Sequence, residues 1–136
     1  TMNKQFFISL LFALLTFVIL GSLFGNFVFL PEFATWHEAY PDAVRETPDF
    51  VSGFVLGLLQ LIAFVVLLPK LQITSGSGAA MFGAVYSVII WLIVDLQMVS
   101  VTNIVSYEYV LKDALLSAVM GAILGVVVSW SQRRFA

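Results

Sequence analysis

The chain has no cysteine, only one histidine and few charged residues, which make up 10% of its 136 positions. Without cysteine it forms no disulfides and offers no thiols for redox chemistry or metal binding. The single histidine, His37, excludes a two-histidine metal site or a bis-histidine haem within one chain. A net charge of −2 without a basic patch excludes a nucleic-acid-binding surface. We therefore expect no cofactor, no metal and no nucleic-acid partner.

Apolar residues are abundant instead: they make up 61% of the chain and give a mean hydropathy of +1.05. Four apolar stretches predict helices at about residues 6–30, 50–69, 79–102 and 107–131. A bilayer core is about 30 Å thick and is crossed by about 20 apolar residues of helix, so each stretch can span it. The sequence therefore predicts an all-α protein of one domain, residues 1–136, folded as a four-transmembrane-helix bundle within the lipid bilayer.

Proline and capping residues predict where these helices begin and end. Pro31 is expected to close the first helix. Thr47-Pro48-Asp49 has the pattern of an N-cap, a proline at the first helical position and an acid in the first turn, so it is expected to open the second helix. Ser106 is a predicted N-cap for the fourth helix. Only residues 31–48 are then left as a long loop.

This loop is too long to be a simple turn, and its aromatic residues recur at helical spacing. The pattern predicts a short helix lying in the outer interface of the membrane. Trp36, His37 and Tyr40 belong to this helix. They would serve as an aromatic anchor at headgroup depth, which is the common use of such residues, or as a lid over a site.

The distribution of Lys and Arg predicts the topology of a multi-pass protein of the bacterial inner membrane. Four of these residues fall on the side of the two chain ends and two on the opposite side: Lys4, Lys70, Arg133 and Arg134 against Arg45 and Lys112. Because positive loops stay inside, both termini are expected in the cytoplasm. All eight acidic residues then lie in the outward half.

Small residues predict how the helices pack. The first, second and fourth helices contain Gly21-x-x-x-Gly25, Gly53-x-x-x-Gly57 and Gly121-x-x-x-Gly125, and the third has a stripe of Ala80, Ala84 and Ser87. Such faces let backbones approach closely in lipid. The same faces could also build a homo-oligomer or a larger membrane complex.

Asp95 is the most informative polar residue within the predicted spans, because the small stripe of the third helix, continued at helical spacing, leads to it. A charge in the outer third of the membrane is costly unless it is paired or hydrated, so it is a candidate functional group. Residues at similar depth predict an outward polar cluster: Asn26, Asp95, Gln97, Lys112 and Asp113. Gln60 is a separate candidate near the middle of the bilayer.

Structural interpretations remain open for these residues. Asp95 could serve only to hold the bundle together by hydrogen bonds, or it could bind a substrate or a proton. Lys112 could pair with Glu108, four residues before it, and extend outward along the helix surface.

The fourth helix resembles the closing segment of an uncharacterised bacterial family of small four-span membrane proteins, a domain of unknown function. The resemblance rests on Leu111-Lys112-Asp113-Ala114 followed by Met120-Gly121-Ala122-Ile123-Leu124-Gly125, and on the order of spans and loops. It departs from that family at Phe24-Gly25-Asn26-Phe27, where a Trp-Tyr-x-Pro run is expected. The resemblance implies a fold and no activity.

These observations favour a binding, accessory or assembly subunit whose outward polar cluster around Asp95 holds a ligand or partner. The alternative is a small-molecule or proton-coupled transporter or channel, which could be dimeric. An enzyme acting on lipid is a third and less favoured option, since it would need a second acid or a metal beside Asp95. A water-filled cavity reaching Asp95 would favour transport, whereas an apolar plug would not.

Overall fold

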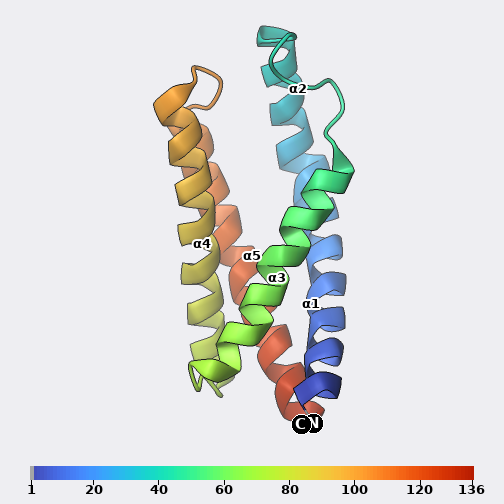
Figure 1. Cartoon of the computed structure of the whole chain (residues 1–136). Coiled ribbons are helices and arrows are strands. Elements are labelled where there is room, and N and C mark those ends of the chain that lie inside the picture. The colour runs from blue at the N-terminus through green and yellow to red at the C-terminus, as the bar shows by residue number, and fades with distance from the viewer. Residues whose placement is uncertain (1) are drawn as a thin grey trace.

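The computed structural model describes residues 2–136, which form a bundle of long helices (Figure 1). The elements in chain order are α1 (Met2–Phe24), the π-helical turn η1 (Gly25–Phe29), α2 (Leu30–Ala39), α3 (Phe50–Lys70), α4 (Gly76–Val101) and α5 (Tyr107–Arg134). Four helices are long and apolar enough to cross a membrane, the first running without a break over Lys4–Ala39. The all-α four-helix bundle is confirmed, and the chain is a multi-pass membrane protein.

Both ends of the chain lie at one end of the bundle, here called the terminal end (Figure 1). The opposite end, here called the far end, carries the loop after α2 and the loop between α4 and α5. In Figure 1, α3 runs diagonally across the other helices. Its ring of Phe64 stacks on Phe82 of α4, with the ring centroids 5.5 Å apart.

The first helix does not end at Pro31, which corrects the sequence prediction. The helix continues to Ala39, so the predicted interfacial helix is its direct extension, α2. The N–H of Leu30 donates to the carbonyl of Gly25, which widens the turn just before the proline. A proline has no N–H and its ring collides with the preceding turn of a regular α-helix. The π turn removes this conflict and lets the helix continue.

Capping side chains begin the other helices. Asp49, not Thr47, is the N-cap of α3, because its carboxylate accepts a hydrogen bond from the N–H of Val51 at 3.3 Å. Ser75 caps α4, which therefore begins at Gly76, three residues before the predicted start. Ser106 caps α5 as predicted, with its hydroxyl accepting from the N–H of Tyr109 at 3.1 Å.

The glycines of α4 and α5 bring these two helices into backbone contact. A Cβ on Gly83 would overlap the carbonyl of Gly121, and a Cβ on Gly125 would overlap that of Ala79. By contrast, Gly21, Gly25 and Gly53 have no neighbouring atom within 4 Å of a Cβ position. The sequence alone does not distinguish these three glycines from the glycines that make close contacts. Close packing through small residues is thus found in the α4–α5 hairpin and not along the glycine pair of α1.

Hydrogen bonds hold α1, α3 and α5 together at the terminal end. The Ser131 hydroxyl donates to that of Ser9 at 3.0 Å, and the Gln5 amide donates to the carbonyl of Gln132 at 2.7 Å. Gln132 in turn donates to the carbonyl of Val65 on α3 at 3.2 Å. The larger apolar core lies at this end, around Ala13, Leu61, Phe64, Val65, Leu68, Ala79, Leu124 and Val128. A separate, smaller cluster holds the far end.

Candidate functional site

Two buried carboxyl groups meet between α4 and α5 near the far end. Asp95 is 6% exposed and Asp113 is 5% exposed. Asp95 lies six positions before Val101 and Asp113 six positions after Tyr107, so each is about 9 Å from its helix end. The two carboxyl groups are close enough to influence each other electrostatically. We call them the carboxyl pair.

The hydrogen bonds of the carboxyl pair are incomplete. The Ser117 hydroxyl donates to Asp113 Oδ1 at 3.3 Å, whereas Asp95 Oδ2 is buried and has no hydrogen-bond partner. Ionised carboxylates only accept hydrogen bonds, so a bond between two of them requires a proton on one. A single shared proton would remove the repulsion between the two acids and give the unpaired oxygen a role. The arrangement is therefore chemically suited to holding a proton.

Aromatic rings cover the carboxyl pair on its far-end side. Tyr109 lies one helical turn from Asp113 on α5 and is buried. Trp36 packs edge-on against Tyr109 with centroids 4.7 Å apart, and Phe33 and Phe29 continue the cluster. We call these four rings, Phe29, Phe33, Trp36 and Tyr109, the aromatic roof.

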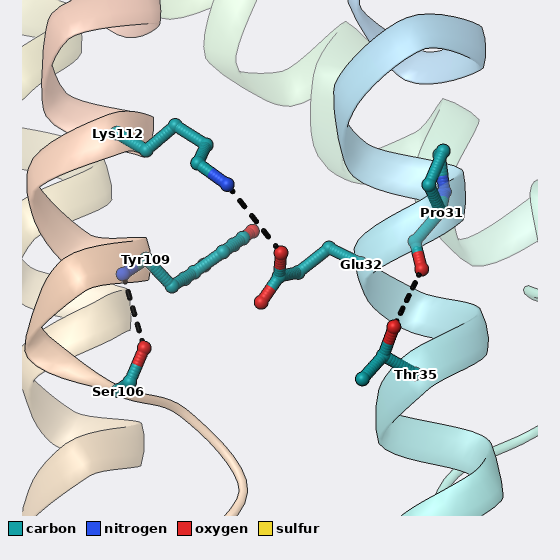
Figure 2. Close-up of polar contacts among 6 residues, drawn as sticks. All are labelled: Pro31, Glu32, Thr35, Ser106, Tyr109 and Lys112. Carbon is teal, nitrogen blue, oxygen red and sulfur yellow. Dashed lines mark hydrogen bonds and ion pairs between the residues drawn. The ribbon is translucent and has the colours of Figure 1, made fainter.

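An ion pair joins α5 to α2 beside this roof. Lys112 Nζ lies 3.5 Å from Glu32 Oε2, and Figure 2 shows the two side chains pointing toward one another across the space between the helices. Glu32 and Lys112 also line a cavity of about 320 Å³ together with Phe27, Val28, Pro31 and Thr35. Neither member of the carboxyl pair lines this cavity. The space beside the roof therefore stops short of Asp95.

The predicted polar cluster is brought together only in part. Asp95 and Asp113 meet, but Lys112 points to Glu32 rather than to them, and it does not pair with Glu108. Asn26 and Gln97 are exposed on the bundle surface and make no side-chain hydrogen bond among residues 2–136. Their depth was predicted to match that of Asp95, but their faces of the helices point elsewhere.

The remaining candidates have structural contacts. The carbonyl of Gln60 accepts a hydrogen bond from the Tyr86 hydroxyl at 3.2 Å, while its side-chain Oε1 is buried and unpartnered. His37 Nδ1 lies 2.7 Å from the carbonyl of Val44 and so fixes the loop after α2. The Tyr40 hydroxyl donates to the carbonyl of Asn103 at 3.2 Å, which ties that loop region to the turn between α4 and α5.

Sequence reasoning missed Glu32, although the residue was visible as an acid at the outer side. The sequence predicts that Pro31 ends the first helix and that Glu32 belongs to a separate interfacial helix, which leaves its position relative to Lys112 undefined. In the continuous helix, Glu32 instead has a fixed face, and Lys112 reaches it from α5. The overlooked signal was the uninterrupted helical spacing on both sides of the proline.

An apolar stretch interrupts the polar interior of the α4–α5 hairpin about halfway along it, before the buried Ser129 and Ser131. Ser117 and Ser87 are buried on the terminal side of the carboxyl pair. Beyond Ser87, the backbones touch at Gly83 and Gly121, and glycine, alanine and leucine are the buried residues over the following turns. Among residues 2–136, no group of three or more His, Asp or Glu side chains is placed to hold a metal ion.

No family model, curated protein or solved structure matches this chain.

Proposed function

We propose that this small integral membrane protein is a binding or accessory subunit whose carboxyl pair takes up and releases a proton at the outward side of a bacterial inner membrane. In this proposal both termini are cytoplasmic and the far end faces outward. The observation that carries it is the meeting of Asp95 and Asp113, with one oxygen of Asp95 buried and unpartnered. Buried acids within a membrane are expected to have a function beyond packing.

Loss of the shared proton would change the far end of the molecule. Two ionised carboxylates in contact repel each other strongly where water is excluded. The glycine contacts lie on the terminal side of the pair, so the repulsion acts on the part of the hairpin that they do not hold. Tyr109 lies within electrostatic reach of Asp113, Asp95 and Glu32. A change in protonation would therefore reach the aromatic roof and the surface available to a partner.

Binding is favoured over passage through the bundle. The buried polar side chains of the hairpin are interrupted at the backbone contact of Gly83 with Gly121 and resume only at Ser129 and Ser131. At the terminal end, hydrogen bonds from Ser131, Gln5 and Gln132 tie three helices together. A proton that enters from the far side thus meets an apolar contact before it reaches the terminal side.

A proton-coupled transporter or channel is the second candidate, and the unpartnered Asp95 Oδ2 favours it because such proteins carry protons on membrane acids. Proteoliposomes loaded with a pH-sensitive dye separate the two roles. The binding subunit gives no flux above that of empty vesicles. A flux that Asp95→Asn abolishes would instead establish the transport role.

Infrared difference spectroscopy on the intact chain in nanodiscs tests the proton site directly. We expect the C=O stretching band of a protonated carboxyl group at neutral pH, its loss on alkalinisation, and a shifted or lost band in both Asp95→Asn and Asp113→Asn. Glu46→Gln, at an exposed loop acid, is the matched control and keeps the band. A wild-type spectrum with no protonated carboxyl at any pH would overturn the proposal.

The partner surface is also a proposal. Gly53 on α3 has open space around it, so a second copy of the chain or another membrane subunit could approach there. Cross-linking of the purified chain in lipid tests self-association, and Gly53→Leu should reduce it. An unchanged cross-linking yield in that variant would remove this face from the proposal.

A further inference from the structure

The cavity beside the aromatic roof has a polar side and an apolar side arranged along one helix. Phe27 and Val28 lie toward the terminal end, and Glu32 and Thr35 lie one to two turns further toward the far end. The volume of about 320 Å³ is at the small end of the usual range for ligand sites. Phe27 is 77% exposed, so the apolar wall is open toward the surrounding lipid.

The polar side of the cavity offers both signs of charge. The Thr35 hydroxyl already donates to the carbonyl of Pro31 at 3.1 Å, which leaves Glu32 and Lys112 as the groups available to a ligand. The distance of 3.5 Å between Lys112 Nζ and Glu32 Oε2 is longer than the N–O distance of a strong charged hydrogen bond, which is about 2.7–2.9 Å. An ammonium has three donors and a carboxylate two acceptor oxygens, so each keeps bonding capacity beyond this one contact.

We infer that this cavity binds the headgroup of a phospholipid that carries a primary ammonium next to its phosphate, as an ethanolamine headgroup does. The phosphate accepts from Lys112 and the ammonium donates to Glu32. The acyl chains then lie toward Phe27 and Val28, in the direction of the bilayer interior. Figure 2 shows the two charged side chains extended from α5 and α2 into the space between them.

The backbone before the cavity also leaves room for an acyl chain. Gly25 and Gly21 precede Val28 on the same continuous helix, toward the terminal end. Neither has an atom within 4 Å of a Cβ position. A lipid chain leaving the headgroup therefore meets a shallow, uncovered strip of α1. This inference is independent of the proton site, because Asp95 and Asp113 do not line the cavity.

Native mass spectrometry of the intact chain in detergent tests the inference, using ethanolamine, choline and glycerol phospholipids with identical acyl chains. The choline headgroup has the same charges without N–H donors, and the glycerol headgroup lacks the cation. A hydrogen bond between charged groups is worth about a tenfold factor or more, so we expect about tenfold greater retention of the ethanolamine lipid. Equal retention of the three lipids would overturn the inference.

Two variants test the cavity itself. The double variant Glu32→Gln/Lys112→Gln removes both charges without leaving either one unpaired, and Thr35→Trp fills the cavity while keeping the ion pair. Both should lose the preference for the ethanolamine lipid, and a preference that survives in both would contradict the assignment. Asp95→Asn should keep the preference for the ethanolamine lipid even if it abolishes proton binding by the carboxyl pair. The lipid site and the proton site can therefore be tested independently.

Free phosphoethanolamine distinguishes a lipid site from a headgroup site. It carries the same ammonium and phosphate but has no chain to contact Phe27 and Val28. We expect it to leave the bound lipid in place at a concentration equal to that of the lipid. Displacement at equal concentration would show that the headgroup alone is recognised, which would overturn the lipid assignment.

Discussion

The indole ring of Trp36 lies edge-on to the phenol ring of Tyr109, with the ring centroids 4.7 Å apart and the planes at 71°. Trp36 belongs to the extension of the first helix, and Tyr109 stands one turn from Asp113 on α5. This contact therefore links α2 to α5 on the far-end side of the carboxyl pair. Trp36 therefore packs within the aromatic roof and does not serve only as an anchor in the membrane interface.

Trp36→Ala should loosen the far end of the hairpin without unfolding the bundle. An aromatic pair of this geometry contributes about 1 kcal/mol beyond its buried area. Hydrogen exchange should accelerate at the amides of residues 107–113. Trp130→Ala is the matched control, because Trp130 packs on Phe12 at the other end of the bundle. Equal acceleration in the two variants would show that Trp36 does not cover the site specifically.

Gly121→Ala and Gly21→Ala should have opposite effects on stability. A Cβ at Gly121 overlaps the carbonyl of Gly83 and forces the two helices apart, at a cost of about 1–3 kcal/mol. At Gly21 a Cβ meets nothing within 4 Å, so alanine should stabilise α1 by about 0.5–1 kcal/mol through its better helix propensity. Thermal unfolding in detergent measures both, and similar losses in the two variants would contradict the packing described above.

The glycine result shows what the sequence could and could not predict. The spans follow from run length alone, since about 20 apolar residues are needed to cross a bilayer. Depth along the predicted helices places Asp95 and Asp113 in one predicted cluster. The glycine pairs look alike in the sequence, however, because a pair does not indicate which helix lies beside it. Only the neighbours decide that Gly121 is covered and Gly21 is not.

The sequence prediction that Pro31 ends the first helix is wrong, because the π turn before it lets the helix continue. Pro31 usually ends a helix, but the π turn at Gly25–Phe29 precedes it and the helix continues. The direction of Glu32, and hence its ion pair with Lys112, depended on that continuation. Sequence spacing gave the depth of the polar residues but not the helix face on which Asn26 lies.

Acid should fray the start of α3 through its N-cap. The Ser52 hydroxyl donates to Asp49 at 2.6 Å and, together with the N–H of Val51 and the charge of Arg45, holds the pKa of Asp49 below its usual 3.8. Because the pKa is lower in the folded state, the stabilisation is present above the unfolded value and is lost as the pH falls through the folded value. The protection factor of the Val51 amide, which corrects for the intrinsic pH dependence of exchange, should therefore fall on acidification below about pH 4.

Asp49→Asn is the control for this pH effect, because asparagine is an equally good N-cap that does not titrate. Its protection factor at Val51 should stay constant over the same pH range. The start of α5 supplies an internal reference, since its cap, Ser106, has no titrating group. Acid-induced exchange of the same size at the starts of α3 and α5 would point to general loosening rather than to the cap.

The ion pair of Glu32 with Lys112 should contribute little to stability. The two side chains are 27% and 41% exposed, and exposed pairs are worth about 0–1 kcal/mol. Glu32→Gln, Lys112→Gln and the double variant should thus unfold within about 1 kcal/mol of the wild type, and added salt should narrow the difference. Chemical unfolding in detergent at low and high salt measures this. A decrease of several kcal/mol in the free energy of unfolding of either single variant would mean that the ion pair stabilises the fold. A small loss instead leaves both charges free to serve a ligand.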